Sequence, residues 1–278
     1  MSHATQPIRP TQEDRQAIRL LVRMRDDFQA MRKRMDNRIG RKADGEAMDI
    51  DERQFRPEDL QNFATLADAA KTQEAEIEKM LKKLLKRFPV YTEFMRDVKG
   101  LGHTYAAWII AEIDIHEAST VSKLWQFAGL NPAMVRGKVR KEHDDGSFEL
   151  VTTDKMIRGD KLTKGFVAPY NSRLRTALAG VMADCMIKSR SEYAIEHYYP
   201  YKCRLEHSDK IVTENVAGGK TREVAWKDAT PMHRHRAAIR YMVKMFLRDL
   251  YRTWRELEGL EVRPDYHEEK LGHQHDAA

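Results

Sequence analysis

The sequence is poor in the residues that mark several large protein classes. It has only two cysteines among 278 residues, Cys185 and Cys203. These are too few for a disulfide framework or a zinc-binding pattern, so we expect two ordinary buried or half-buried thiols. No run approaches the roughly 18 uninterrupted apolar residues of a membrane-spanning helix, and the N-terminal residues 1–4 lack the apolar core of a secretory signal. These absences favour a cytoplasmic protein with no membrane partner.

Positive charge is in modest excess and is unevenly distributed. Lys and Arg number 49 against 43 Asp and Glu, and the segment from Arg15 to Lys42 has ten basic and three acidic residues. A basic segment of this kind is either an ordinary solvated helix surface or a surface that follows nucleic-acid phosphates. The sequence leaves both interpretations open. The length suffices for about two domains, each able to bury a core.

The N-terminal region, residues 1–88, has the apolar spacing of two long helices. Apolar residues alternate at intervals of three and four, which is the pattern of a coiled-coil seam. The seam residues are Ala17, Leu21, Met24, Phe28, Met31 and Met35 in the first helix and Phe63, Ala67, Ala70, Ile77, Leu81, Leu84 and Phe88 in the second. The polar stretch 43–56 predicts a loop between them. The helices can pair as an antiparallel hairpin or between subunits, and we expect a homo-oligomer through the coiled coil.

A helix-hairpin-helix is predicted where Val98-Lys99-Gly100-Leu101-Gly102-His103-Thr104 precedes an apolar helix. Such a hairpin needs glycine where the backbone takes a positive φ or passes close to another backbone. The amides freed at the start of the second helix form an anion site that suits a phosphate. The alternative is that Gly100 and Gly102 only make a tight connection between two helices of a core.

The predicted domain over 89–260 continues with further helices. Thr120 has the position of an N-cap, and Gly129 followed by Pro132 predicts the end of that helix. Segments 134–141 and 148–152 flank an Asp-Gly turn and predict a short β-hairpin. Three more helices are predicted over 171–188, 191–206 and 231–257, and a disordered tail over 261–278. The expected fold class is mainly α: a long helical coiled-coil hairpin, then a helical helix-hairpin-helix domain with a minor β-hairpin.

The order of these segments resembles the C-terminal transposase domain of the insertion-sequence transposases that include the Piv-type DNA invertases and the bridge-RNA-guided recombinases. In that family five short motifs precede a long basic helix that ends near a Trp. In order they are a G-[IL]-G hairpin, an A-E-I helix end, an A-G-L-x-P helix end, an [IL]-[ST]-K segment and an N-x-x-L-R helix start. The matching residues are Gly100-Leu101-Gly102, Ala111-Glu112-Ile113, Ala128-Gly129-Leu130-Asn131-Pro132, Leu162-Thr163-Lys164, Asn171-Ser172-Arg173-Leu174-Arg175 and the helix from His233 to Trp254. The resemblance covers about residues 89–257. It implies a DNA-binding, transposase-like or recombinase-like protein of mobile-element origin.

The chain lacks the catalytic metal domain that the resemblance implies. Family members carry an N-terminal RuvC-like domain whose four acidic residues bind divalent metal, whereas residues 1–88 here have a coiled-coil pattern. Asp49, Asp51 and Glu52 fall in the predicted loop, without strands to order them around a metal. We therefore expect no metal site, and Mg²⁺ is expected only if the protein is catalytically active.

The family's nucleophilic serine is also replaced. It belongs to an S-G pair shortly after the A-G-L-x-P helix end, and the matching pair here is Arg136-Gly137. Three nearby hydroxyls are weak candidates for a substitute nucleophile: Ser147, Thr163 and Ser172. A nucleophilic hydroxyl needs an activating base and stabilisation of developing charge, and the sequence shows neither.

The residues expected to contact nucleic acid belong to the basic segments of the matched region. Arg236, Arg240 and Lys244 recur every four residues and predict one basic stripe on a helix, for which a solvated surface is the alternative. The full set of expected nucleic-acid-binding residues is Lys99, Gly100, Gly102, His103, Thr104, Lys164, Arg173, Arg175, Arg236, Arg240 and Lys244. Phosphate contacts through these residues predict binding that is salt-sensitive and largely independent of sequence.

Three functions are consistent with the sequence. The first is a DNA-binding protein that needs no cofactor for binding, with structured RNA as a further partner implied by the resemblance. The second is an active serine-dependent recombinase or transposase that works with a catalytic partner chain. The third is a coiled-coil scaffold whose basic surface is incidental.

Overall fold

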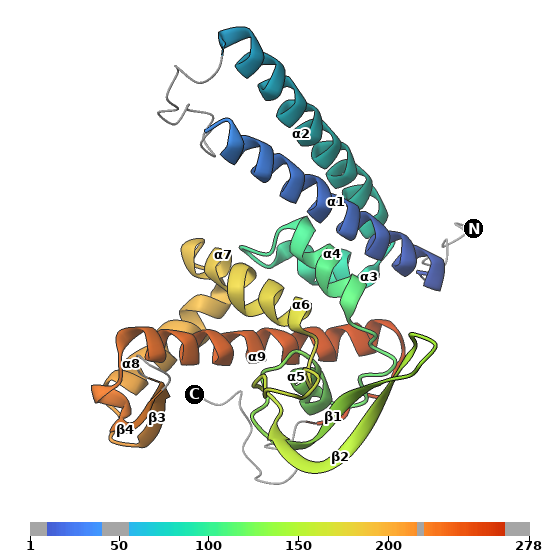
Figure 1. Ribbon diagram of the computed structural model, residues 1–278. Helices are drawn as coiled ribbons and strands as arrows, with labels where there is room; N and C mark the ends of the chain where they lie inside the picture. Colours follow the sequence, from blue (N-terminus) through green and yellow to red (C-terminus); the bar gives the residue numbers. More distant parts are fainter. Residues whose placement is uncertain (1–9, 41–55, 216–219, 265–278) are drawn as a thin grey trace, which may run out of the picture. The chain divides into compact units, whose positions relative to one another are not determined.

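A computed structural model describes residues 10–40, 56–215 and 220–264 of the chain (Figure 1). Within these ranges the chain forms two compact units. The first unit comprises the residues up to Thr92 together with Ala106–Glu112, and the second comprises Glu93–Tyr105 and the residues from Ile113 onward. The loop predicted over 43–56 lies outside the described residues except for Arg56, and so does the predicted tail beyond residue 264. Residues 261–264 have no regular secondary structure.

The first unit is built on a pair of long helices, α1 (Gln12–Arg38) and α2 (Pro57–Leu85). α1 begins with a capping box, in which the Thr11 hydroxyl accepts from the Asp14 amide at 3.2 Å and the Asp14 carboxylate accepts from the Thr11 amide at 3.0 Å. α2 begins with a proline, which suits a first helical position. The Arg87 guanidinium, just after α2, donates to Asp14 at 2.7 Å. The end of α2 therefore lies beside the start of α1, and the two helices pair within one chain as an antiparallel hairpin.

Polar residues occupy much of the contact between α1 and α2. Ile18 of α1 is fully buried, but Arg25 and Arg32 lie on the same face of the helix. Their guanidinium groups contact the carboxylate of Glu74 in α2 at 3.0 Å and 2.9 Å. Glu74 is itself buried, so this carboxylate holds the distal half of the hairpin together.

The seam predicted for α1 is partly wrong. The ion pairs with Glu74 fix the rotation of α1 so that part of the predicted apolar seam lies beside the contact with α2 and not within it. Met24 and Met31 are 39% and 38% exposed. On α2 the prediction is confirmed for Ala67, Ala70, Ile77 and Leu81 and for Phe88 just beyond the helix, all of which are buried, whereas Phe63 is 41% exposed. The hairpin consequently has apolar side chains on its surface.

The first unit also contains most of α3 (Pro89–Glu93) and the C-terminal part of α4 (His103–Glu112). Arg19 of α1 donates two hydrogen bonds to the Ala111 carbonyl oxygen, at 3.0 Å and 2.8 Å. A carbonyl in the last turn of a helix has no intrahelical partner, and a guanidinium satisfies it well. Residues of α3 and α4 therefore belong to this unit, although the sequence pattern divides the chain after residue 88.

The second unit is mainly helical, as predicted. Its α-helices are α5 (Val121–Phe127), α6 (Ser172–Arg175), α7 (Ala183–Lys188), α8 (Tyr199–Glu206) and α9 (Pro231–Leu257). π-helical turns over Thr176–Met182 and Ala194–Tyr198 join α6 to α7 and lead into α8, and short 3-10 turns occur at Met95–Asp97 and Trp226–Asp228. The helices predicted over 171–188, 191–206 and 231–257 are confirmed.

Two antiparallel hairpins supply the β-structure of the second unit. β1 (Met134–Glu142) pairs with β2 (Phe148–Arg158) around a turn in which Gly146 has a φ of +80°, so the predicted hairpin is present and longer than expected. β3 (Ile211–Asn215) pairs with β4 (Thr221–Ala225), and this second hairpin was not predicted. The fold class, mainly α with a small β component, is as expected.

Side-chain hydrogen bonds tie α9 to the segment around α5. Arg255 is buried and donates from Nη1 to the carbonyl oxygens of Ile115 and Ala118 at 2.9 Å and 3.0 Å. The Tyr251 hydroxyl donates to the Ser119 carbonyl oxygen at 3.0 Å. These bonds satisfy loop carbonyls that would otherwise lose their water on burial, and they fix the orientation of α9.

None of the helices in the described ranges combines the length and the apolar character needed to cross a membrane. Cys185 is half-buried as expected, whereas Cys203 is exposed.

Candidate nucleic-acid interface

The predicted hairpin meets the glycine requirement at Gly100 but not at Gly102. Gly100 has a φ of +86°, and a Cβ at this position would lie 2.7 Å from the Met186 Cα and 2.9 Å from the Cys185 carbonyl carbon. Glycine is therefore needed here both for backbone conformation and for the close approach to α7. Gly102 has no positive φ, and a Cβ there would meet open space. The geometry of Gly100 is what a tight core connection requires.

The residues that follow the hairpin differ in their access to solvent. α4 begins at His103, so the first amides of this helix have no intrahelical acceptor. Lys99 is exposed, Thr104 is half-buried, and the Nε2 atom of His103 is buried. This nitrogen does not reach solvent, so Lys99 and the backbone carry what anion-binding capacity the hairpin has.

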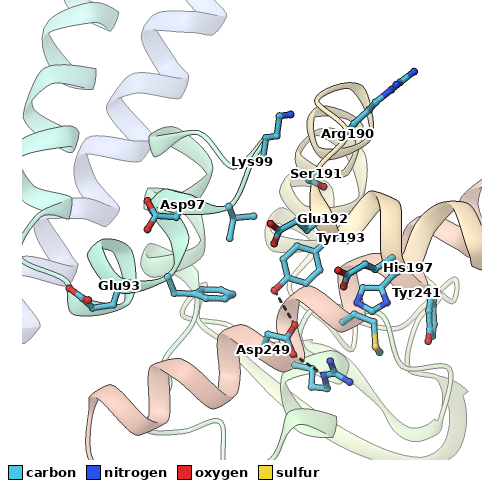
Figure 2. A pocket seen from close by; sticks show the side chains of 15 residues that line it. Glu93, Asp97, Lys99, Arg190, Ser191, Glu192, Tyr193, His197, Tyr241 and Asp249 are labelled. Atoms are coloured by element: carbon cyan, nitrogen blue, oxygen red, sulfur yellow. Dashed lines mark hydrogen bonds and ion pairs between the residues drawn. The ribbon is translucent and has the colours of Figure 1, made fainter. Parts of the chain in front are cut away.

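An acidic cleft of about 1110 Å³ lies beside the hairpin within the second unit (Figure 2). At its base the Tyr193 hydroxyl donates to Asp249 at 3.0 Å, and Arg248 donates to the same carboxylate at 2.9 Å. Burial, together with the charge of Asp249, raises the pKa of the Tyr193 phenol far above its ordinary value. Figure 2 shows the side chains of Lys99 and Arg190 extending away from this pair. The charged residues that line the cleft are Glu93, Asp97, Glu192, Glu196 and Asp249 against Lys99, Arg190 and Arg248. Carboxylates prevail, so the cleft itself disfavours a phosphate.

A second site gathers four cations around one carboxylate, and we call it the cationic cluster: Arg158, Arg175, Arg240 and Lys244 with Asp160. Arg158 donates from Nε and Nη2 to the two carboxylate oxygens of Asp160, each at 2.9 Å. Arg175 donates from Nη1 to the backbone carbonyl oxygen of Asp160. Burial would raise the pKa of Asp160, but the hydrogen bonds and charge of Arg158 outweigh it, so the pKa is lowered and Asp160 stays ionised. The carboxylate is thus already engaged by Arg158, which leaves the other cations in excess.

Arg240 and Lys244 are half-buried and share the carboxylate of Asp160 with Arg158. Burial lowers the pKa of the Arg240 guanidinium; Asp160 opposes the shift, and the charges of Arg175 and Arg158 add to it. Burial also lowers the pKa of the Lys244 ammonium, and the charge of Arg240 lowers it further. Among the described residues neither side chain has an ion pair, although the Lys244 ammonium lies 5.1 Å from the centre of the Trp125 ring. Desolvated like charges held together in this way are costly unless a ligand compensates them.

Gly129 explains how α5 and α6 build this cluster. α5 ends in a Schellman motif, in which the Gly129 amide donates to the Gln126 carbonyl at 3.0 Å and the Leu130 amide donates to the Trp125 carbonyl at 2.8 Å. A Cβ on Gly129 would lie 2.7 Å from Tyr170 Cγ and 3.0 Å from Arg175 Cδ. The bare α-carbon of Gly129 therefore makes room for the Tyr170 ring. The Arg175 guanidinium in turn lies 4.8 Å from the centre of that ring, as a cation–π contact.

The remaining basic residues of the predicted set lie on the surface. Lys164, Arg173 and Arg236 are exposed. Arg236 stands one helical turn before Arg240, so the predicted stripe on α9 runs from an exposed residue into the half-buried cluster. The cluster thus combines Arg175, Arg240 and Lys244 of the predicted set, while Lys99, Gly100, Gly102, His103 and Thr104 form the separate hairpin.

The three candidate nucleophiles lie in different elements. The Ser147 hydroxyl donates to Asp145 at 2.6 Å in the exposed turn between β1 and β2, where it stabilises the turn. Thr163 lies in the loop after β2, and Ser172 is the exposed first residue of α6, which the side chain of Asn171 caps. The partner of Ser147 is thus a carboxylate in an exposed turn and not an imidazole or an amine base.

A metal site of the kind the family uses does not fit the residues that are described. No group of three or more His, Cys, Asp and Glu side chains there could hold a metal ion. Asp49, Asp51 and Glu52 lie outside the described ranges. No catalytic step through a metal can therefore be derived from these residues.

Sequence reasoning missed two residues of the cluster, Arg158 and Asp160, and the Tyr170 ring that Arg175 packs against. The available signal was that two residues of opposite charge, Arg158 and Asp160, stand two positions apart after a predicted strand. Their contact with α6, however, depends on the fold of the loop between β2 and α6. A comparison with protein-family models and with curated proteins finds no match to this chain.

Proposed function

We propose that this protein binds the backbone of nucleic acid, with the cationic cluster as its principal phosphate contact. The observation that carries the proposal is that Arg240 and Lys244, one helical turn apart on α9, are both half-buried cations whose pKa values are lowered, first by burial and then by the charges of neighbouring cations. A phosphodiester would supply the missing negative charge and accept hydrogen bonds from the guanidinium. Clustered, partly desolvated cations that outnumber their carboxylates, as four cations outnumber Asp160 here, are typical of binding sites.

Nucleic acid is favoured over a small anion because the positive charge extends beyond the cluster. The exposed side chains of Lys164, Arg173 and Arg236 adjoin the same segments in sequence, and a chain of phosphates can engage cations spread over such a surface, whereas one small anion engages a single point. Together with the resemblance of residues 89–257, this supports a DNA-binding protein of mobile-element origin, related to transposases and recombinases and working in the cytoplasm. Structured RNA is the second nucleic-acid partner that the resemblance implies.

Binding in this proposal requires no cofactor and no nucleophile. Ser147, Thr163 and Ser172 are not assigned to chemistry in this proposal, and the contact of Ser147 with Asp145 stabilises an exposed turn. The alternative function, an active serine-dependent recombinase or transposase, would use a hydroxyl of this chain such as Ser172 or Ser147 together with a catalytic domain supplied by a partner chain.

We further propose that the chain forms a homo-oligomer through the hairpin of α1 and α2. Apolar side chains that the hairpin leaves on its surface support this: Leu66 and Met80 of α2 are 58% and 52% exposed, and Met24 and Met31 of α1 are 39% and 38% exposed. Burial of these side chains against a second copy would remove apolar area from water.

The test incubates the purified protein with labelled duplex DNA, branched DNA and structured RNA in Mg²⁺ at low and high salt, and compares native with denaturing gels. We expect shifts on native gels that weaken steeply with salt and no change on denaturing gels. Cleaved strands or a denaturation-resistant adduct would establish chemistry that the proposal denies. Absence of any shift at low salt would overturn the proposal and leave the scaffold function.

A further inference from the structure

We infer that the ribbon of β1 and β2 is a second nucleic-acid-binding element that enters the major groove of duplex DNA. This inference rests on the proposed function and adds to it the cations of β1, which lie outside the cationic cluster, whereas Arg158 at the end of β2 belongs to that cluster. The ribbon is visible in Figure 1 as the long twisted pair of strands that belongs to the second unit. Its two faces differ in burial and in charge.

One face of the ribbon is covered by the loop that follows β2. Ile157 is buried, and Gly137 packs against Phe166 so closely that a Cβ would lie 2.5 Å from the Phe166 Cδ1. The Val167 amide donates to the Lys138 carbonyl oxygen at 2.8 Å, and the Thr153 hydroxyl donates to the Gly137 carbonyl oxygen at 3.0 Å. The contacts of Phe166 and Val167 hold the ribbon to the loop after β2, whereas the bond from Thr153 joins the two strands of the ribbon.

The opposite face, which we call the outer face, is exposed along its length. Residues directly opposite in an antiparallel pair point to the same side, and here Arg136 faces Met156, Arg140 faces Leu150 and Glu142 faces Phe148. Phe148, Leu150 and Met156 are 53%, 45% and 48% exposed. The cations of this face are Arg136, Lys138 and Arg140, all exposed.

On the outer face the cations lie on β1 and the apolar side chains lie on β2, so that Arg136 and Arg140 each stand opposite an apolar residue. The Arg140 guanidinium lies 4.0 Å from the centre of the Phe148 ring and 3.4 Å from Glu142. Glu142 is the one carboxylate among the β1 residues of this face, so three cations there carry a net positive charge. A purely apolar partner would bury these cations without a counter-charge. A partner that offered only negative charge would leave the apolar side chains in water.

The major groove of DNA suits both kinds of side chain. It is about 12 Å wide and admits a two-stranded ribbon, it presents guanine acceptors to Arg and Lys, and it presents thymine methyl groups to apolar side chains. The nine residues of β1 span about 30 Å at roughly 3.3 Å per residue, which is close to one turn of the duplex. Length, charge and side-chain chemistry therefore agree on duplex DNA as the occupant.

The test measures dimethyl sulfate methylation of guanine N7, an atom that lies in the major groove, on a labelled duplex bound by the full chain at low salt. We expect the protein to protect guanines, and the triple variant Arg136→Gln/Lys138→Gln/Arg140→Gln to lose the protection and about tenfold or more in affinity. The matched control is Lys71→Gln/Lys82→Gln/Lys83→Gln, which removes the same charge from exposed positions of α2 and should keep the footprint. A further variant, Phe148→Ser/Leu150→Ser, keeps every cation and should lose part of the protection.

The outcomes separate this inference from the proposed function. A duplex that is bound without N7 protection, or a triple variant with an unchanged footprint, overturns the ribbon inference and leaves the cationic cluster in place. Loss of protection in the control as well would show a general charge effect and would also overturn it. No binding by the unmodified protein would overturn both proposals.

Discussion

The ring of Tyr170 packs against the α-carbon of Gly129. A Cβ added to this glycine would lie only 2.7 Å from the Tyr170 Cγ. Gly129 also has a φ of +69°, so two independent constraints act on one residue. Because Arg175 packs against the same glycine and ring, this contact links the end of α5 to the cationic cluster.

Replacement of Gly129 by alanine should therefore cost more than the backbone strain alone. Gly259 has the same φ of +69° with nothing near its missing Cβ, so Gly259→Ala is the matched control. We expect Gly259→Ala to lower the free energy of unfolding by about 1 kcal/mol and Gly129→Ala by about 2–4 kcal/mol, with added strain from the forced contact. Urea denaturation measures both. Equal losses would mean that the Tyr170 ring moves aside freely.

Glu214 should make the stability of the β3–β4 hairpin depend on acid pH. Its buried carboxylate accepts from the Thr230 hydroxyl, from the Thr230 amide at 2.9 Å and from Arg222 at 2.8 Å. The hydrogen bonds from Thr230 and then Arg222 lower the pKa of Glu214 from 4.5 to about 2. The ionised group therefore stabilises the fold above pH 4.5, and this contribution is lost as the pH falls from about 4.5 to about 2.

The variant Glu214→Gln should be less stable than the wild type at pH 7, and the difference should shrink as the pH approaches 2. Chemical denaturation at several pH values measures it. Glu223→Gln, which changes an exposed carboxyl on β4, should behave like the wild type throughout. A difference between wild type and Glu214→Gln that stays constant with pH would contradict this assignment.

The exposed apolar side chains of the α1–α2 hairpin should govern oligomeric state. Sedimentation of the full chain should give more than one copy, and Met24→Asp/Met31→Asp should shift it to a single copy, because two charges cannot be buried unpaired in an apolar contact. Gln16→Asp/Ala30→Asp adds the same charge to other exposed positions of α1 and should change nothing. A wild-type protein with the mass of one chain would refute the homo-oligomer.

The helices could be predicted from sequence because their signals are local. Thr120 and Asn171 cap α5 and α6 through their own side chains, and the basic spacing of α9 placed Arg240 and Lys244 on one face. The joining of these cations with Arg158 and Asp160 could not be predicted, because the contact depends on the path of the loop between β2 and α6.

Two errors in the predicted fold share a physical cause. A prediction from apolar spacing assumes that the contacts between helices or strands are apolar. Arg25 and Arg32, however, bind the buried Glu74 and so set the rotation of α1. In the same way β3 and β4 are anchored by Glu214, whose partners are polar. A buried carboxylate with guanidinium partners leaves no periodic apolar signal in the sequence.

The central claim is that Arg240 is held half-buried for a phosphate and not for the fold. Replacing it with Met removes a desolvated charge next to Arg175 and Lys244, so the free energy of unfolding should stay the same or rise by about 0.5–1 kcal/mol. Lys188→Met removes one exposed charge from α7 and serves as the control.

The most direct test is the salt dependence of duplex binding by the wild type, Arg240→Met and Lys188→Met. We expect Arg240→Met to bind more weakly and to reduce the slope of log affinity against log salt by about 1, as the loss of one phosphate contact requires, while Lys188→Met matches the wild type. Arg240→Met with the affinity and slope of the wild type would contradict the account.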